Sequence, residues 1–168
     1  MSLLAPLQIA CLVAFALLLL LAAWQDLRTM RIADAVSLTI VPVFAVWALS
    51  GLALGTLSFS TAGLALACAA AAFGVGAVAF AAGVLGGGDV KLLAASSLFA
   101  GPALMPDFLM ATSLAGGVLG LAVLAGAPIG PAVPAGHASI RLRLRGGLPY
   151  GPAIAIGGLW VAGSLALR

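Results

Sequence analysis

Long apolar stretches with almost no charged residues are the feature that most constrains this sequence. No charged residue occurs between Asp34 and Asp89. Of the 168 residues, 64% are hydrophobic and only 7% are charged, which is too few charges to cover the surface of a water-soluble domain. We therefore predict an integral membrane protein.

The apolar runs are continuous and do not alternate with polar residues, so they indicate membrane-spanning helices and not the strands of a barrel. A helix needs roughly 20 apolar residues to cross a bilayer. Charges, prolines and glycine clusters divide the sequence into about six spans. We predict an all-α, polytopic membrane protein that forms one domain over residues 1–168, with spans at 3–24, 35–54, 61–85, 90–104, 108–125 and 148–167.

The basic residues predict the orientation of these spans in the membrane. Six of the seven fall on one side, namely Arg28, Arg31, Lys91, Arg141, Arg143 and Arg145. Because basic residues favour cytoplasmic segments, this side should be cytoplasmic and both termini should face outward. The segment 126–147, rich in Pro, Gly and Arg, is predicted to be a loop on the same side.

The residues that commonly bind metals are sparse. Cys11 and Cys68 lie within predicted spans and fit packing roles, and His137, in the predicted loop, is the only histidine. We expect no metal site and no cofactor. We also expect no nucleic-acid partner, since the net charge of +3 follows from the membrane orientation.

Four acidic residues are the informative positions. Asp107 follows Pro106 at the predicted start of the fifth span and fits a helix cap. Asp26, Asp34 and Asp89 all lie at the predicted cytoplasmic ends of spans. Three carboxylates from distant parts of the sequence are therefore expected at one depth in the membrane.

Two interpretations of these carboxylates stay open at this point. Asp34 and Asp89 can each cap a helix, with residues 86–88 ending the third span in a left-handed conformation. Asp26 is harder to explain in this way, because a helix C-terminus disfavours negative charge, although Arg28 can neutralise it. Ionisable groups near the membrane are otherwise candidates for function.

Two adjacent carboxylates suit the chemistry of an aspartic peptidase. Like charges a few ångströms apart do not ionise together, so such a pair holds one proton; the ionised partner activates water and the protonated partner donates to the substrate carbonyl. Glycines next to the aspartate leave room for an extended peptide.

Three segments together resemble the type IV prepilin peptidase family of membrane aspartic peptidases. They are DLRTMRIAD (26–34), GGGDVKLLAA (86–95) and GGLPYGPAIAIGG (146–158). The resemblance implies that Asp26 and Asp89 are the catalytic aspartates. It also implies supporting or substrate-binding roles for Arg28, Asp34, Gly86, Gly88, Lys91, Pro149, Tyr150, Gly151 and Pro152, with Lys91 favoured as an anchor.

The sequence departs from the family pattern in two places. Ile32, Ala33 and Asp34 stand where the family commonly has Ile-Pro-Asn, and we interpret Asp34 as a cap. The longer family members carry a cytoplasmic methyltransferase domain between the first two spans, for which this chain has no room. It therefore resembles the short, peptidase-only form associated with Flp-type (Tad) pili.

The resemblance implies a function and a location. The substrate would be a prepilin or pseudopilin with a short basic leader and an apolar helix, cleaved at the cytoplasmic face of the bacterial inner membrane. Alternatives are a small proton or ion transporter or channel subunit, and a noncatalytic scaffold of a pilus or secretion machine. A presenilin-type intramembrane peptidase is less favoured, since the aspartates lie at the ends of spans.

Overall fold

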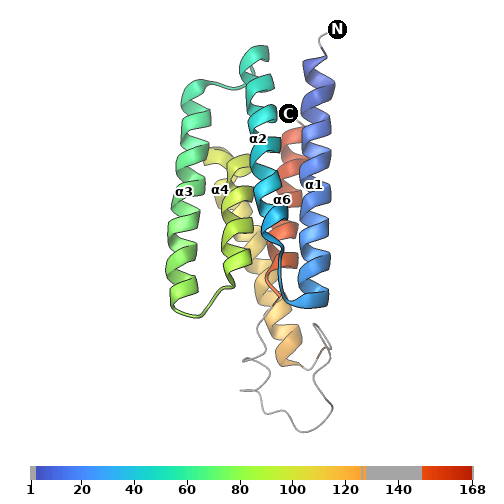
Figure 1. Cartoon of the computed structure of the whole chain (residues 1–168), viewed down its shortest axis with the longest axis vertical. Helices are drawn as coiled ribbons and strands as arrows, with labels where there is room; N and C mark the ends of the chain where they lie inside the picture. Colours follow the sequence, from blue (N-terminus) through green and yellow to red (C-terminus); the bar gives the residue numbers. More distant parts are fainter. Residues whose placement is uncertain (1–2, 126, 128–148, 168) are drawn as a thin grey trace.

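The computed structural model describes residues 3–125, 127 and 149–167, and its elements are helices (Figure 1). Four of them are long and apolar enough to cross a membrane, and a fifth, α6, is apolar but shorter. This confirms the predicted all-α, polytopic membrane fold. The helices are α1 (Leu4–Thr29), α2 (Asp34–Leu54), α3 (Phe59–Ala81), α4 (Gly87–Leu124) and α6 (Gly151–Ala166).

The helix α4 is broken at Gly101 and reverses direction there. Gly101 has φ 52° and ψ −168°, a conformation that is accessible essentially to glycine alone. Pro102 follows it and suits the first position of a new helix. Figure 1 shows the ribbon turning back at this point towards the end of the bundle from which α4 starts. The two arms of α4, residues 87–100 and 102–124, therefore form a hairpin.

Close contacts at glycines show that neighbouring segments run in opposite directions. On the first arm of α4, Val90 lies against Gly76 of α3, and Gly101 lies near Ala65. On the second arm, Phe108 and Thr112 contact Gly157 of α6. With the two arms of α4 counted separately, the described residues form six helical segments, and the predicted number of membrane spans stays a prediction.

The break in α4 corrects one prediction from the sequence. We expected the fourth and fifth spans to separate between residues 104 and 108, with Asp107 capping the fifth. Asp107 instead lies within the second arm of α4 and is half-buried. The cap prediction is wrong because the backbone reverses where Gly101 permits a positive φ, six residues earlier.

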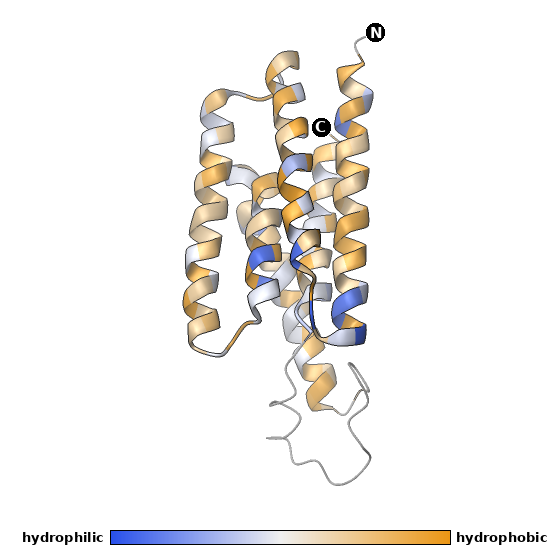
Figure 2. Ribbon diagram, viewed as in Figure 1, coloured by the Kyte–Doolittle hydropathy of each residue, from blue (hydrophilic) through white to orange (hydrophobic). Residues whose placement is uncertain are grey.

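Aromatic side chains form the centre of the bundle. The rings of Phe15 and Phe99 stack with their centroids 4.2 Å apart, and Phe44 meets Phe99 edge-on at 5.3 Å. The outward faces are apolar as well, with Leu17 60% and Val75 73% exposed, as expected for surfaces that face lipid. Strongly hydrophilic positions gather mainly where α1 ends and α2 and α4 begin (Figure 2).

The antiparallel packing of α1 and α6 places the start of α1 and the end of α6 at the same end of the bundle. The placement of both termini on the outer side of a membrane stays a prediction. The predicted loop at 126–147, with His137 and its three arginines, lies outside the described residues apart from Ala127.

Candidate functional site

Asp26 is buried in the last turns of α1, with 4% of its surface exposed. The helix ends a few residues later, where Met30 adopts a left-handed conformation and donates its N–H to the backbone carbonyl of Asp26 at 2.8 Å. The carboxylate Oδ2 accepts a hydrogen bond from the N–H of Gly151 at 2.7 Å. Because Gly151 is the first residue of α6, the helix dipole favours a negative charge at Asp26.

Asp89 is buried in the first turn of α4, with 8% of its surface exposed. Its Oδ2 accepts a hydrogen bond from the N–H of Gly86 at 3.2 Å, so this carboxylate does stabilise the start of a helix. Its Oδ1 is buried and has no hydrogen-bond partner among the described residues. A buried oxygen without a partner is costly, so Asp89 combines a capping contact with a free acceptor.

The two carboxyl groups approach each other from different helices and are close enough to interact electrostatically. They lie on α1 and α4, separated by more than sixty residues of sequence. The structure thus brings Asp26 and Asp89 together at one end of the bundle, where the sequence predicted that they would meet. Such a pair can share a proton and act as acid and base.

Three glycines around the site are closely packed by their neighbours. A Cβ added at Gly151 would lie 2.7 Å from the Cβ of Asp26, and one added at Gly86 would lie 2.7 Å from Oδ2 of Asp89. A Cβ at Gly88 would lie 3.1 Å from the Cβ of Ile32 in the loop between α1 and α2. The close contacts, and not a left-handed backbone, account for glycine at these positions. We expected a left-handed conformation at residues 86–88, but the glycine with a positive φ in this turn is Gly83.

Asp34 is not the cap that the sequence suggested. The N-cap of α2 is Ala33, and Asp34 is the first helical residue, with no capping hydrogen bond from a side chain. Its Oδ2 instead accepts from Nζ of Lys91 at 2.6 Å, and both side chains are about half exposed. This ion pair ties the start of α2 to the first arm of α4, and the anchoring role of Lys91 stays a prediction.

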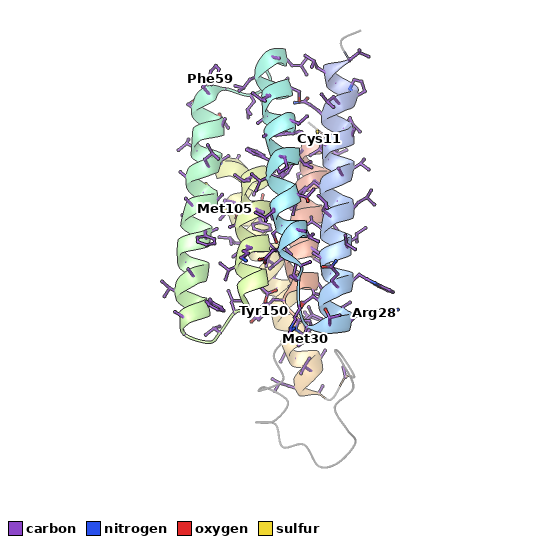
Figure 3. All side chains as sticks on the ribbon, viewed as in Figure 1. Cys11, Arg28, Met30, Phe59, Met105 and Tyr150 are labelled. Atoms are coloured by element: carbon purple, nitrogen blue, oxygen red, sulfur yellow. The ribbon has the colours of Figure 1, made fainter. Side chains whose placement is uncertain are left out.

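Arg28 turns away from the two aspartates. Its guanidinium lies 4.1 Å from the ring centroid of Trp24, in the geometry of a cation–π contact, and the side chain points outward from the bundle (Figure 3). Arg28 therefore does not neutralise Asp26 in this structure. An aromatic ring and a guanidinium on one helix face are typical of the membrane interface.

The Pro149–Pro152 segment forms the start of α6 beside Asp26. Pro149 is fully buried, and Pro152 occupies the second helical position, where its missing N–H costs nothing. The ring of Tyr150 packs 3.3 Å from the Cβ position of Gly116 on α4 and lies at the same end of the bundle as Met30 (Figure 3). The segment thus presents the Gly151 N–H to Asp26.

Two contacts in the loop between α1 and α2 were not found from the sequence. Ile32 is buried against Gly88, which joins the loop after Asp26 to the turn before Asp89. Oε1 of Gln25 accepts from the N–H of Ala33 at 3.1 Å and holds the same loop. The apolar Ile32 next to Arg31 in this short link was the only signal of such a role.

The described residues contain no group of three His, Cys, Asp or Glu side chains that could hold a metal ion. What this end of the bundle offers is a carboxylate pair, fixed by backbone N–H groups at two helix starts. Together with the apolar helices, it defines a multi-pass membrane protein with a buried two-aspartate site.

The chain belongs to the type IV leader peptidase family, whose model matches residues 13–121, more than half of its length. No curated protein and no solved structure matches it. The matched range contains both Asp26 and Asp89 and ends before the Pro149–Pro152 segment. Membership in this family supports peptidase activity in a membrane setting and confirms the resemblance drawn from the sequence.

Proposed function

We propose that the chain is an aspartic endopeptidase that removes the short basic leader from type IV, Flp-like prepilins or pseudopilins. The observation that carries the proposal is the pair of buried carboxylates, Asp26 and Asp89, which lie on separate helices and are close enough to interact electrostatically. We place the cut at the cytoplasmic face of the bacterial inner membrane, because Arg28, Arg31 and Lys91 lie at the same end as the aspartates.

The hydrogen bonds suggest separate roles for the two aspartates. Asp26 accepts a short bond from Gly151 at a helix N-terminus, which favours its ionised form as the base. The Oδ1 of Asp89 has no partner among the described residues, which favours a protonated acid that donates to the substrate. Water then attacks the scissile carbonyl carbon, its proton passes to Asp26, and Asp89 protonates the carbonyl oxygen. When the C–N bond breaks, the leaving amine takes up the proton from Asp26, and a hydroxyl of the tetrahedral intermediate returns its proton to Asp89 as the carboxyl product forms.

We also propose that the chain cleaves without methylating its product. The methyltransferase domain of longer family members lies between the first two spans, and here only residues 30–33 link α1 to α2. Mass spectrometry of the cleaved substrate would show an unmodified N-terminal amine. A product heavier by one methyl group, made by the purified chain with a methyl donor, would contradict this part of the proposal.

The test is processing of a co-expressed Flp-type prepilin, read as a size shift on a gel. We expect Asp26→Asn and Asp89→Asn to abolish processing while both variants still insert into the membrane. Asp107→Asn is the matched control, since Asp107 lies on the second arm of α4, away from the pair, and should process normally. Normal processing by either dyad variant would refute the assignment, and absence of processing by the wild type would refute the proposed function.

A proton or ion transporter and a noncatalytic scaffold remain the alternatives from other classes. Membership in a peptidase family favours the enzyme over both of them. A scaffold would tolerate Asn at both aspartates, and a transporter would produce ion flux in liposomes without cleaving any prepilin.

A further inference from the structure

A groove separates α2 from α3 on the side of the bundle. In the bundle α3 packs against α4, and α2 packs against α1 and α4. Between α2 and α3 lies a cavity of about 220 Å³ with the first arm of α4 as its floor. We call it the α2–α3 groove, and its lining includes Ser37 and Val41 from α2, Ala69 and Phe73 from α3, and Lys91 and Ala95 from α4.

One end of the α2–α3 groove lies at about the same depth in the bundle as the two-aspartate site. Lys91, which lines the groove, comes two residues after Asp89 on α4 and pairs with Asp34 at the start of α2. Residues two apart on a helix point to opposite faces, so an occupant of the groove would have one end at the depth of Asp89 but across α4 from it. An unwound peptide would reach the acid around the start of α4.

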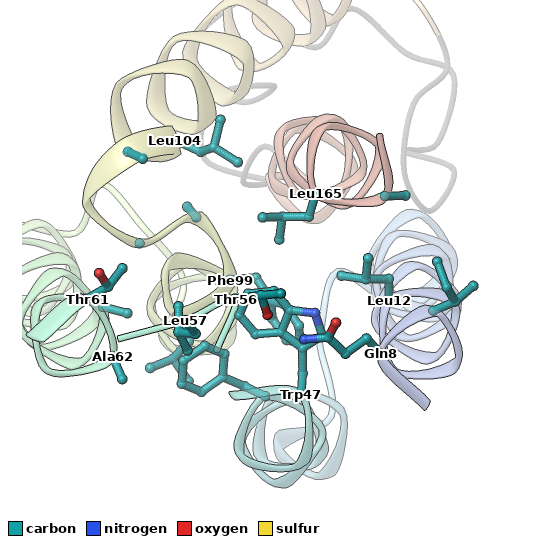
Figure 4. A pocket seen from close by; sticks show the side chains of 18 of the residues that line it. Gln8, Leu12, Trp47, Thr56, Leu57, Thr61, Ala62, Phe99, Leu104 and Leu165 are labelled. Carbon is teal, nitrogen blue, oxygen red and sulfur yellow. The ribbon is translucent and has the colours of Figure 1, made fainter. Parts of the chain in front are cut away.

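A second cavity of about 620 Å³ lies at the far end of the bundle. Leu98 lines both cavities. The second cavity exists because the first arm of α4 stops at Gly101, so no helix fills the centre beyond it. Side chains from several helices surround this space, among them Leu12, Trp47 and Leu104 (Figure 4).

The walls of the α2–α3 groove suit a peptide helix better than a lipid chain. Ala69 and Ala95 are small and allow a close approach of backbones, as at other helix contacts in membranes. Ser37 is 3% exposed, and its hydroxyl has no hydrogen-bond partner among the described residues. A hydroxyl at this depth needs an acceptor, which the backbone carbonyl of an unwound peptide supplies and a hydrocarbon chain does not.

We propose that the α2–α3 groove binds the apolar membrane helix of the substrate, and that the peptide leaves helical geometry near Ser37 and passes around the start of α4, so that the scissile bond reaches Asp89. The inference rests on the proposed peptidase function and adds to it the route by which the substrate enters, sideways from the membrane between α2 and α3.

Processing of a co-expressed prepilin by matched leucine variants tests the groove. Ala69→Leu places a larger side chain in the groove, whereas Ala67→Leu makes the same change on an exposed position of α3 that lines neither cavity. We expect Ala69→Leu to slow processing about tenfold or more, as overpacking of a close apolar contact does, and Ala67→Leu to process like the wild type. Equal rates for the two variants would overturn the proposal.

The hydroxyl of Ser37 is tested by a second pair of variants. Ser37→Ala should slow processing about fivefold, the effect of one lost hydrogen bond. Thr39→Ala is the control, because the Thr39 hydroxyl is exposed and bonds to the carbonyl of Ala35 within its own helix. A rate for Ser37→Ala equal to that of Thr39→Ala would refute the role of this hydroxyl.

Disulfide cross-linking keeps the proposal testable even if Ala69→Leu folds poorly. In a chain whose Cys11 and Cys68 are replaced by Ala, a cysteine at Val41 should cross-link to a cysteine in the substrate's apolar helix, and one at the lipid-facing Val75 should not. If only the cysteine at Val75 cross-linked, in a chain that still cleaves, the substrate helix would not bind in the groove. This result would overturn the inference while the proposed function stands. Loss of cleavage by the wild type itself would instead refute the proposed function.

Discussion

Replacing Gly151 by alanine should selectively damage the proposed active site. The added Cβ would lie 2.7 Å from the Cβ and 2.9 Å from Oδ2 of Asp26, closer than real Cβ atoms come to such neighbours. Asp26 is 4% exposed, so its side chain has little room to move away. The start of α6 or the end of α1 must then shift, and the 2.7 Å hydrogen bond from the Gly151 N–H must lengthen.

The magnitude follows from the cost of overpacking a buried contact. Such a change costs about 1–3 kcal/mol, and if this cost falls on the geometry of Asp26 in the transition state, cleavage slows by about 5- to 150-fold. Gly163→Ala is the matched control on the same helix, because a Cβ there would meet nothing within 4 Å. It should leave cleavage unchanged and stabilise α6 by about 0.5–1 kcal/mol through helix propensity.

The assay is the rate of prepilin cleavage by purified protein in detergent or liposomes, with thermal unfolding of each variant measured beside it. We expect Gly151→Ala to lose activity at temperatures where it remains folded. If Gly151→Ala and Gly163→Ala cleaved at the same rate, the contact between α6 and Asp26 would have no catalytic role and the reasoning would be refuted.

Two further predictions concern the ion pair and the break in α4. Asp34→Asn and Lys91→Met should each keep most of the activity, because an exposed ion pair stabilises by only ~0–1 kcal/mol; loss of cleavage in Asp34→Asn alone would show that the site is misassigned. Gly101→Ala should destabilise the protein by about 1–3 kcal/mol, since alanine strains at φ 52°. Thermal unfolding in detergent measures this, with Gly117→Ala, whose added Cβ meets nothing within 4 Å, as control; equal stabilities would mean that the reversal does not depend on glycine.

The fold class could be predicted from the sequence because membranes leave few solutions for apolar runs. A backbone without water must satisfy its own hydrogen bonds, so long uncharged segments become helices. The positions where helices end were less predictable. The α4 reversal falls at Gly101 and not at Pro106, because a positive φ was needed and the sequence pattern does not show which glycine adopts it.

The candidate site could be predicted in part. The placement of Asp26 and Asp89 at one end of the bundle could be predicted, because each lies at the end of a predicted span on the same side. It did not reveal that Lys91 pairs with Asp34, that Arg28 turns to Trp24, or that the N–H of Gly151 binds Asp26. These contacts depend on how helices distant in sequence rotate and pack, which hydropathy does not encode.

The sequence by itself determined that this chain is a helical membrane protein with a few carboxylates at one end, because apolar length and charge position are properties of the chain alone. Only the tertiary structure decided which carboxylates meet, which glycines give them room, and where the bundle stays open. Those features arise from side chains that fit between helices, and a change of one Cβ at Gly151 or Gly88 is enough to disturb them.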